Sequence, residues 1–179
     1  MRDFYLILSR SNTVMAQLVR LFTRKYYSHA SIAFDESLDE FYSFGRKHPL
    51  LMFPAGFISE GIHTGYFGVY PKTKVKVLKG QVTEDEYDLL KEHLNEFISA
   101  WDWYRYDVAG LFNLVFKKPS VRARNYTCSG FTAHIFRDIL EFDKNYSLVE
   151  PEDFYKFDFE TIYEGTAGDY SYEKQQIRN

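Results

Sequence analysis

The chain contains a single cysteine, Cys128, which stands where the sequence predicts the start of a helix. A helix N-terminus stabilises a thiolate, because its free backbone N–H groups and the helix dipole favour negative charge. The same N–H groups can donate hydrogen bonds to the oxyanion that develops on an attacked carbonyl. Cys128 is therefore a candidate nucleophile, and the alternative is a small buried side chain that only packs.

A nucleophilic cysteine needs a general base, which is most often a histidine that a third polar group orients. His29 opens a predicted strand, and the residues that share its face, Ser31, Ala33 and Asp35, are small or polar. The imidazole could therefore look out of the sheet toward a packed helix. The alternative is a core histidine whose nitrogens bond to backbone groups.

The other four of the five histidines are weaker candidates for the base. His93 is expected at the surface of a polar helix, and His134 on a different face of the helix that begins at Cys128. His48 and His63 fall in loop or strand-edge contexts and stay open as alternatives. Two-ligand spacing such as i, i+4 is absent, and the ten glycines are scattered, so the sequence predicts neither a metal site nor a phosphate loop.

Hydrophobic periodicity predicts the elements that must position these residues. The predicted strands cover residues 4–8, 28–35, 40–45, 65–70 and 73–78, of which the second and third form a hairpin. The predicted helices cover a segment capped by Asn12 or Thr13 and ending near Arg24, residues 83–100 with a Thr83–Glu86 capping box, and a segment from Cys128 onward. Residues 46–58 are expected to form a structured loop.

Length and composition set limits on fold and partners. The 179 residues fit one domain, which we place at residues 1–170, with a polar C-terminal tail at 171–179. A fraction of 19% aromatic residues predicts a core of large rings, and a net charge of -3 argues against a nucleic-acid-binding surface. The mixed order of helices and hairpins predicts an α+β fold with a mostly antiparallel sheet.

Targeting signals are missing from the chain as given. The apolar run at residues 4–8 is too short for a signal-peptide core and lies between Asp3 and Arg10. Nothing in the chain approaches the roughly 20 consecutive apolar residues of a membrane span. The sequence therefore predicts a cytoplasmic protein without stable membrane insertion, and it carries no signal for an oligomeric state.

Two segments resemble the active-site motifs of a known superfamily. The segment YTCSGFT at residues 126–132 resembles the nucleophile motif of NlpC/P60 cysteine peptidases, and YSHASIA at 27–33 resembles the strand that carries their histidine. Here the histidine lies 99 residues before the cysteine, an order that resembles the circularly permuted, YiiX-like branch of the papain fold. Three further segments resemble an uncharacterised bacterial group in that branch, at residues 42–46, 151–154 and 163–165.

The resemblance implies a papain-like fold, with a mostly antiparallel sheet or partial barrel packed against helices. It implies that Cys128 is the nucleophile and His29 the general base. The family's third polar residue lies on the strand after the histidine, and its best match here is Ser43, with Tyr42 and Glu60 as alternatives. A serine hydroxyl can orient an imidazole, but it adds no negative charge to stabilise an imidazolium.

Three residues are candidates for substrate binding: Tyr42, Tyr106 and Ser129. The aromatic run over 101–106 could form a substrate wall, although core packing is the alternative. A basic set could bind an anionic substrate or form a solvated loop; it comprises Lys117, Lys118, Arg122 and Arg124.

The leading hypothesis is a cysteine hydrolase that needs no cofactor and acts on a small peptide or acyl substrate. Cys128 attacks an amide or ester carbonyl after losing its proton to His29, and water or another acceptor releases the acyl group. Acyltransferases of the lecithin:retinol type carry Asn-Cys-Glu-His-Phe, whereas Ser129 and Gly130 follow the cysteine here, so acyl transfer ranks second among enzymes. The alternatives from other classes are a catalytically weak or inactive ligand-binding domain and a structural domain with a buried cysteine.

Overall fold

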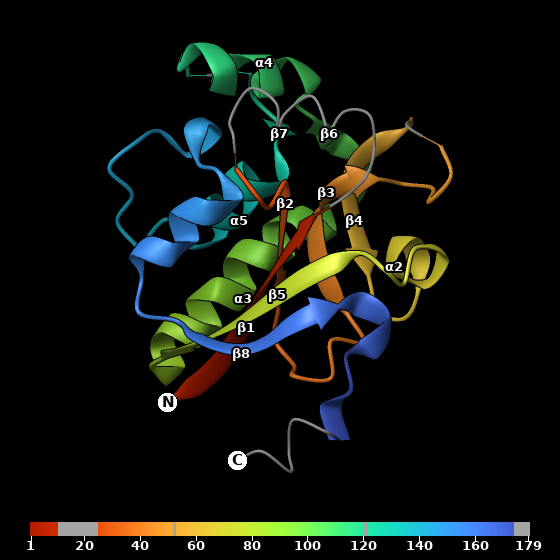
Figure 1. The fold of residues 1–179 in the computed structure, drawn as a ribbon. Helices are drawn as coiled ribbons and strands as arrows, with labels where there is room; N and C mark the ends of the chain where they lie inside the picture. Colours follow the sequence, from red (N-terminus) through yellow and green to blue (C-terminus); the bar gives the residue numbers. More distant parts are fainter. Residues whose placement is uncertain (11–24, 52, 120–121, 174–179) are drawn as a thin grey trace.

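The computed structural model describes residues 1–10, 25–51, 53–119 and 122–173 (Figure 1). Its described residues form an α+β fold built on one open, eight-stranded sheet with the strand order β7-β6-β4-β3-β2-β1-β5-β8. The predicted helix that ends near residue 24 and the end of the predicted tail lie outside the described residues.

The sheet is almost entirely antiparallel, as the sequence predicts, and only β6 and β7 run parallel. Its strands are β1 Arg2–Arg10, β2 His29–Ala33, β3 Phe41–Arg46, β4 Ala55–Glu60, β5 Lys74–Val82, β6 Arg105–Tyr106, β7 Asn125–Tyr126 and β8 Glu160–Thr166. The predicted hairpin is confirmed, because β2 and β3 pair antiparallel with Ile32 opposite Tyr42. The strands predicted over 4–8 and 73–78 are confirmed within the longer β1 and β5.

Helices lie on both sides of the sheet. The α-helices of the described residues are α2 Gly65–Val69, α3 Glu84–Ser99, α4 Val108–Phe116 and α5 Cys128–Ile135, and the short 3-10 helices are η1 Trp101–Trp103, η2 Tyr146–Leu148, η3 Pro151–Lys156 and η4 Ala167–Asp169. The predicted capping box begins α3, since the Thr83 backbone N–H donates to the Glu86 carboxylate at 2.8 Å and Glu86 N–H donates back to the Thr83 hydroxyl at 3.3 Å.

Alternation along the strands divides the core between two faces of the sheet. Leu6 joins a cluster with α3 and α5, whereas its neighbour Ile7 joins a second cluster with Phe67 of α2. The first cluster is rich in aromatic rings, as the composition predicts. Its central ring, Phe131 of α5, lies 5.2 Å from the Phe44 centroid and 4.9 Å from the Phe97 centroid. These contacts hold the N-terminus of α5 against β2 and β3.

Two predicted elements are wrong. The strand predicted over 65–70 is the short helix α2, because a brief apolar run does not distinguish the two states and Phe67 can bury its ring in either. The loop predicted over 46–58 contains β4, which pairs with β3 along its whole length. Gly56 looked like a loop residue, but a glycine is needed in this strand because a Cβ there would lie 2.9 Å from the Tyr104 carbonyl oxygen.

Two elements were missed by the sequence reading. Helix α4 lies inside the aromatic and basic segment that was expected only to wall a cleft or form a loop, and β8 precedes the predicted tail. Among the described residues, no helix combines the length and apolar character that crossing a bilayer requires.

The aromatic packing under α5 should carry much of the stability. We expect Phe131→Ala to lower the free energy of unfolding by about 3–5 kcal/mol, because it removes a fully buried ring from a close-packed cluster. Urea denaturation followed by circular dichroism measures this. Phe116→Ala is the control, since that ring is 69% exposed; equal losses in the two variants would contradict the described core.

Candidate functional site

Cys128 is the first residue of α5, as the sequence predicts. Thr127 caps the helix, and its hydroxyl accepts a hydrogen bond from the Gly130 N–H at 3.1 Å. A Cβ on residue 130 would lie 2.8 Å from that hydroxyl oxygen, so the glycine allows the cap. The thiol is buried, with the residue only 3% exposed.

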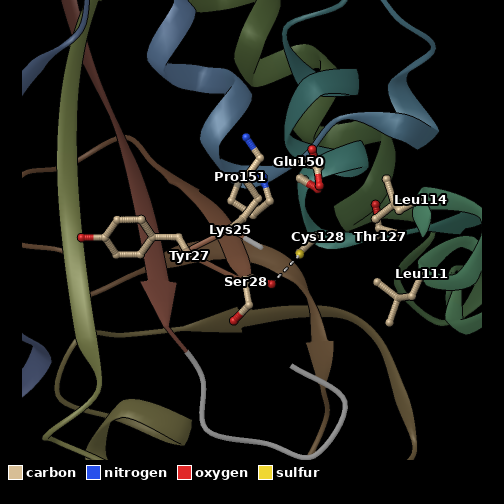
Figure 2. A pocket seen from close by; sticks show the side chains of 10 residues that line it. Lys25, Tyr27, Ser28, Leu111, Leu114, Thr127, Cys128, Glu150 and Pro151 are labelled. Carbon is tan, nitrogen blue, oxygen red and sulfur yellow. Dashed lines mark hydrogen bonds between the residues drawn. The ribbon is translucent and has the colours of Figure 1, made fainter. Parts of the chain in front are cut away.

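The thiol contacts the backbone edge of β2 (Figure 2). Its Sγ lies 3.9 Å from the Ser28 carbonyl oxygen, to which the S–H donates, and it faces the Ala30 N–H. This edge is open to side chains because the ladder between β2 and β3 pairs only residues 32 and 33. The Ser43 hydroxyl occupies the next position along it and donates to the Ala30 carbonyl oxygen at 2.6 Å.

Burial raises the pKa of the Cys128 thiol above its ordinary value. Four hydrogen-bond donors oppose this rise, because each favours the thiolate: the N–H groups of Ala30, Ser129 and Cys128 itself, and the Tyr106 hydroxyl. The structure therefore places a neutral thiol at neutral pH inside a shell of donors that would stabilise negative charge.

Tyr106 is brought to the thiol by the pairing of β6 with β7. It stands opposite Tyr126, two residues before the cysteine. Burial and the neighbouring thiol raise the pKa of Tyr106 well above its ordinary value, so the phenol keeps its proton and can donate it to sulfur. Tyr106, one of the three predicted substrate-binding residues, therefore contacts the candidate nucleophile directly through its hydroxyl.

His29 begins β2 and is half-buried. Alternation and the register of β2 against β3 place His29, Ser31 and Ser43 on one face of the sheet, while Ala30 packs with α5 on the other. Burial and the nearby Arg46 guanidinium lower the pKa of His29 to about 4, so the imidazole is neutral at pH 7. Among the hydrogen bonds of the described residues, none joins this ring to Sγ or to Ser43.

The three candidates for the orienting residue have other partners. Ser43 is buried, and its hydroxyl donates a hydrogen bond to the Ala30 carbonyl oxygen. Tyr42 lies on the opposite strand face, as alternation predicts, where its ring stacks on Phe57 at 6.0 Å. The Glu60 carboxylate accepts from the Tyr66 N–H at 3.3 Å, and burial raises the pKa of Glu60 to about 7.

A small pocket opens beside the thiol (Figure 2). Its volume of ≈ 20 Å³ admits about one water molecule. The pocket is lined by Lys25, Tyr27, Ser28, Leu111, Leu114, Thr127, Cys128, Ser129, Glu150 and Pro151. The Ser129 hydroxyl donates to the Val149 carbonyl oxygen, so this predicted substrate-binding residue offers its backbone N–H to the site.

Sequence reasoning missed the walls of this pocket. Leu111 and Leu114 come from α4, whose start is marked by a signal that could have been read: Asp107 accepts from the Gly110 N–H at 2.8 Å as an N-cap before an apolar run. Glu150 also lines the pocket, and burial raises its pKa. The four basic residues of the predicted anion site do not line the pocket.

One histidine prediction is wrong. His93 is buried, 3% exposed, because the α3 face that carries it meets the end of α5. Its Nδ1 lies 2.8 Å from the Ile135 carbonyl oxygen and its Nε2 lies 3.1 Å from the Asp138 carboxylate. Within the described residues, no three His, Cys, Asp or Glu side chains lie close enough together to hold a metal ion.

Comparison with known proteins gives no relative: no family model, no curated protein and no solved structure matches the chain. The geometry around Cys128 is therefore the feature of the chain that bears on its function.

The Tyr106 hydroxyl should set the reactivity of the thiol. We expect Tyr106→Phe to slow alkylation of Cys128 at pH 8 by about tenfold. The Tyr106 hydroxyl stabilises the thiolate, so its removal lowers the fraction of thiolate that can react. Iodoacetamide labelling followed by intact mass measures the rate at the chain's single cysteine. Tyr104→Phe, a half-buried tyrosine outside the pocket lining, is the control; an unchanged rate in Tyr106→Phe would contradict the hydrogen bond.

Two histidines should make the fold sensitive to acid. Burial is the main cause that lowers the pKa of both His29 and His134 to about 4. The unfolded chain binds their protons near pH 6.5, so stability present above that pH is lost as pH falls toward 4. We expect His29→Gln and His134→Gln each to reduce this loss by about 2 kcal/mol in urea titrations at pH 7 and pH 4. Replacing the exposed His63 should leave the loss of stability between pH 7 and pH 4 unchanged. An equal effect of that replacement would contradict the assignment of this loss to His29 and His134.

Proposed function

We propose that this protein is a cysteine hydrolase with a papain-like arrangement, in which Cys128 attacks the carbonyl of an amide or ester. The observation that supports this most directly is the position of Sγ, at the first residue of α5 and within a shell of four hydrogen-bond donors. These donors stabilise a sulfur that becomes an anion during attack. The backbone N–H of Cys128 can also donate a hydrogen bond to the oxyanion of the tetrahedral intermediate.

His29 is the proposed general base. Both residues that flank it contact the thiol, Ser28 through its carbonyl and Ala30 through its N–H, so the imidazole belongs to the same short segment. A pKa of about 4 leaves the ring neutral and able to accept a proton at pH 7. Since the thiol is also neutral, proton transfer to His29 accompanies the attack and no ion pair precedes it.

The proposed reaction has two halves. The S–C bond forms as the thiol proton passes to the imidazole. Because His29 lies on the sheet face opposite α5, the start of β2 must change conformation for this transfer when a substrate binds. The imidazolium then protonates the leaving amine or alcohol, and a thioester remains. Water attacks that thioester and gives a proton to His29. The imidazolium passes this proton to the departing sulfur, which releases the acid and restores the thiol and the neutral imidazole.

The pocket limits the substrate class. Leu111 and Leu114 give it an apolar lining, and Lys25 and Glu150 add one basic and one acidic side chain. A volume of ≈ 20 Å³ admits about one water molecule, so any substrate must widen the pocket, and a small acyl group requires less widening than a bulky side chain. A small peptide or a short acyl ester suits these walls.

A second candidate function is ligand binding without catalysis. It is favoured by the burial of Cys128, by the raised pKa of its thiol, and by the missing hydrogen bond between thiol and imidazole in the described part of the chain. An acyltransferase would share the first half of the proposed reaction and differ only in the acceptor.

Acylation of the single cysteine separates these functions. We expect a 4-nitrophenyl ester of a short acid to add one acyl group to the native protein, seen by intact mass, and Cys128→Ser to lose this adduct at sulfur. His29→Ala should slow acylation about 100-fold, because general-base catalysis is lost. His63→Ala, which replaces an exposed histidine, is the control.

Two results would contradict the hydrolase. One is acylation at the same rate in His29→Ala and in His63→Ala. The other is a native protein that acylates only after denaturation, which would favour the binding domain.

A further inference from the structure

One end of the molecule exposes large apolar side chains. Apart from the N-terminal Met1, the large apolar residues of the described chain that are more than half exposed are Leu50 (65%), Leu51 (54%), Phe53 (56%), Trp103 (63%) and Phe116 (69%). A single exposed apolar residue needs no explanation, but a group of five on connected segments indicates a surface that something covers.

Contacts join the β3–β4 connection, η1, β6 and Arg124 at one end of the sheet, and α4, which carries Phe116, lies toward the same end. The connection between β3 and β4 is tied to η1 by an ion pair between Lys47 Nζ and Asp102 at 3.0 Å. Strand β4 pairs with β6, and the Arg124 guanidinium lies 4.5 Å from the Trp103 ring centroid. In Figure 1 the β3–β4 connection, β6, β7 and α4 all lie toward the upper end of the view.

The charge of this end is opposite to that of the whole chain. Residues 46–59 and 101–124 together contain seven Lys or Arg residues and two acidic residues, Asp102 and Asp107, although the chain has a net charge of -3. Asp102 is paired with Lys47. Asp107 is 3% exposed and caps α4, so it contributes little to the surface. The exposed basic residues beside the apolar group are Arg105, Lys117, Lys118, Arg122 and Arg124.

We propose that this end docks on the surface of an anionic lipid bilayer. We call it the docking end and define it by Leu50, Leu51, Phe53, Trp103 and Phe116 with the basic residues named above. The apolar side chains enter the interface between headgroups and acyl chains, where tryptophan is favoured, and the Lys and Arg side chains pair with lipid phosphates.

The combination of the two kinds of side chain selects this partner. Nucleic acid would account for the positive charge but not for three exposed Leu and Phe side chains on one connection. A second copy of the chain joined by the same end would oppose basic residues to basic residues. An anionic bilayer satisfies both features at once.

Helix α4 links the docking end to the thiol pocket. Leu111 and Leu114 line the pocket, whereas Phe116 and Lys117 lie at the end of the same helix. A docked molecule would hold the pocket close to the headgroup layer. Docking does not require the thiol, so Cys128→Ser should bind as the unaltered protein does, and failure of the hydrolase would leave this inference standing.

Vesicle sedimentation tests the inference. We expect the protein to sediment with vesicles of phosphatidylcholine and phosphatidylglycerol, to stay in solution with phosphatidylcholine alone, and to be released by salt. The double variants Leu50→Ser with Leu51→Ser and Lys117→Glu with Lys118→Glu should each weaken binding about tenfold. Matched controls replace an exposed apolar and an exposed basic residue elsewhere, Val69→Ser and Lys72→Glu.

Tryptophan fluorescence gives a second readout. Trp103 is exposed and the second tryptophan, Trp101, is half-buried, so bound vesicles should shift the emission to shorter wavelength and Trp103→Phe should abolish the shift. Each of the following results would overturn the inference: binding that does not depend on lipid charge, a control variant that weakens binding as much as the docking-end variants, and a concentration-dependent dimer that Leu50→Ser with Leu51→Ser dissociates. Binding of a single-stranded oligonucleotide that this double variant leaves unchanged would also overturn it.

Discussion

The contact between the Cys128 thiol and the backbone edge of β2 is the interaction on which the rest of the site depends. The ladder between β2 and β3 ends after two residue pairs, so Ser28 and Ala30 present a carbonyl and an N–H to side chains instead of to a strand. The thiol and the Ser43 hydroxyl occupy that edge. A longer ladder would satisfy these backbone groups and leave the thiol no polar partners on the sheet.

The aromatic core keeps this contact in place. Phe131 lies one turn into the helix that Cys128 begins, and its ring packs against rings from β3 and α3. The same packing explains why the thiol is protonated. It leaves Cys128 buried beside a pocket that admits only about one water molecule, and this burial outweighs the four donors around Sγ. The site thus holds a neutral nucleophile and a neutral base. Its hydrogen-bond donors stabilise negative charge that develops only during the attack.

The sequence predicted the elements with strong local signals. The strand predicted from the apolar run of β1, the strand predicted from the alternation of β2, the Thr83–Glu86 capping box and the helix at Cys128 are confirmed. Each depends on residues close in sequence. It could not predict β4 or α4 in the same way. Gly56 has a role only through contact with Tyr104, which is remote in the chain, and α4 is short and nearly uniformly apolar. The chemistry of the site shares this limit, since neither the burial of His93 nor the Tyr106–Cys128 hydrogen bond has a local signature.

The most direct test is the protonation state of Cys128 and His29 in the native protein. Selective 13C labelling gives the chain's one cysteine a single Cβ resonance, and the His29 Cε1 resonance can be assigned with His29→Gln. We expect Cys128 to remain a thiol through pH 7 and to titrate above the ordinary thiol range, while His29 stays neutral down to about pH 4. A thiolate paired with an imidazolium at pH 7 would contradict this account.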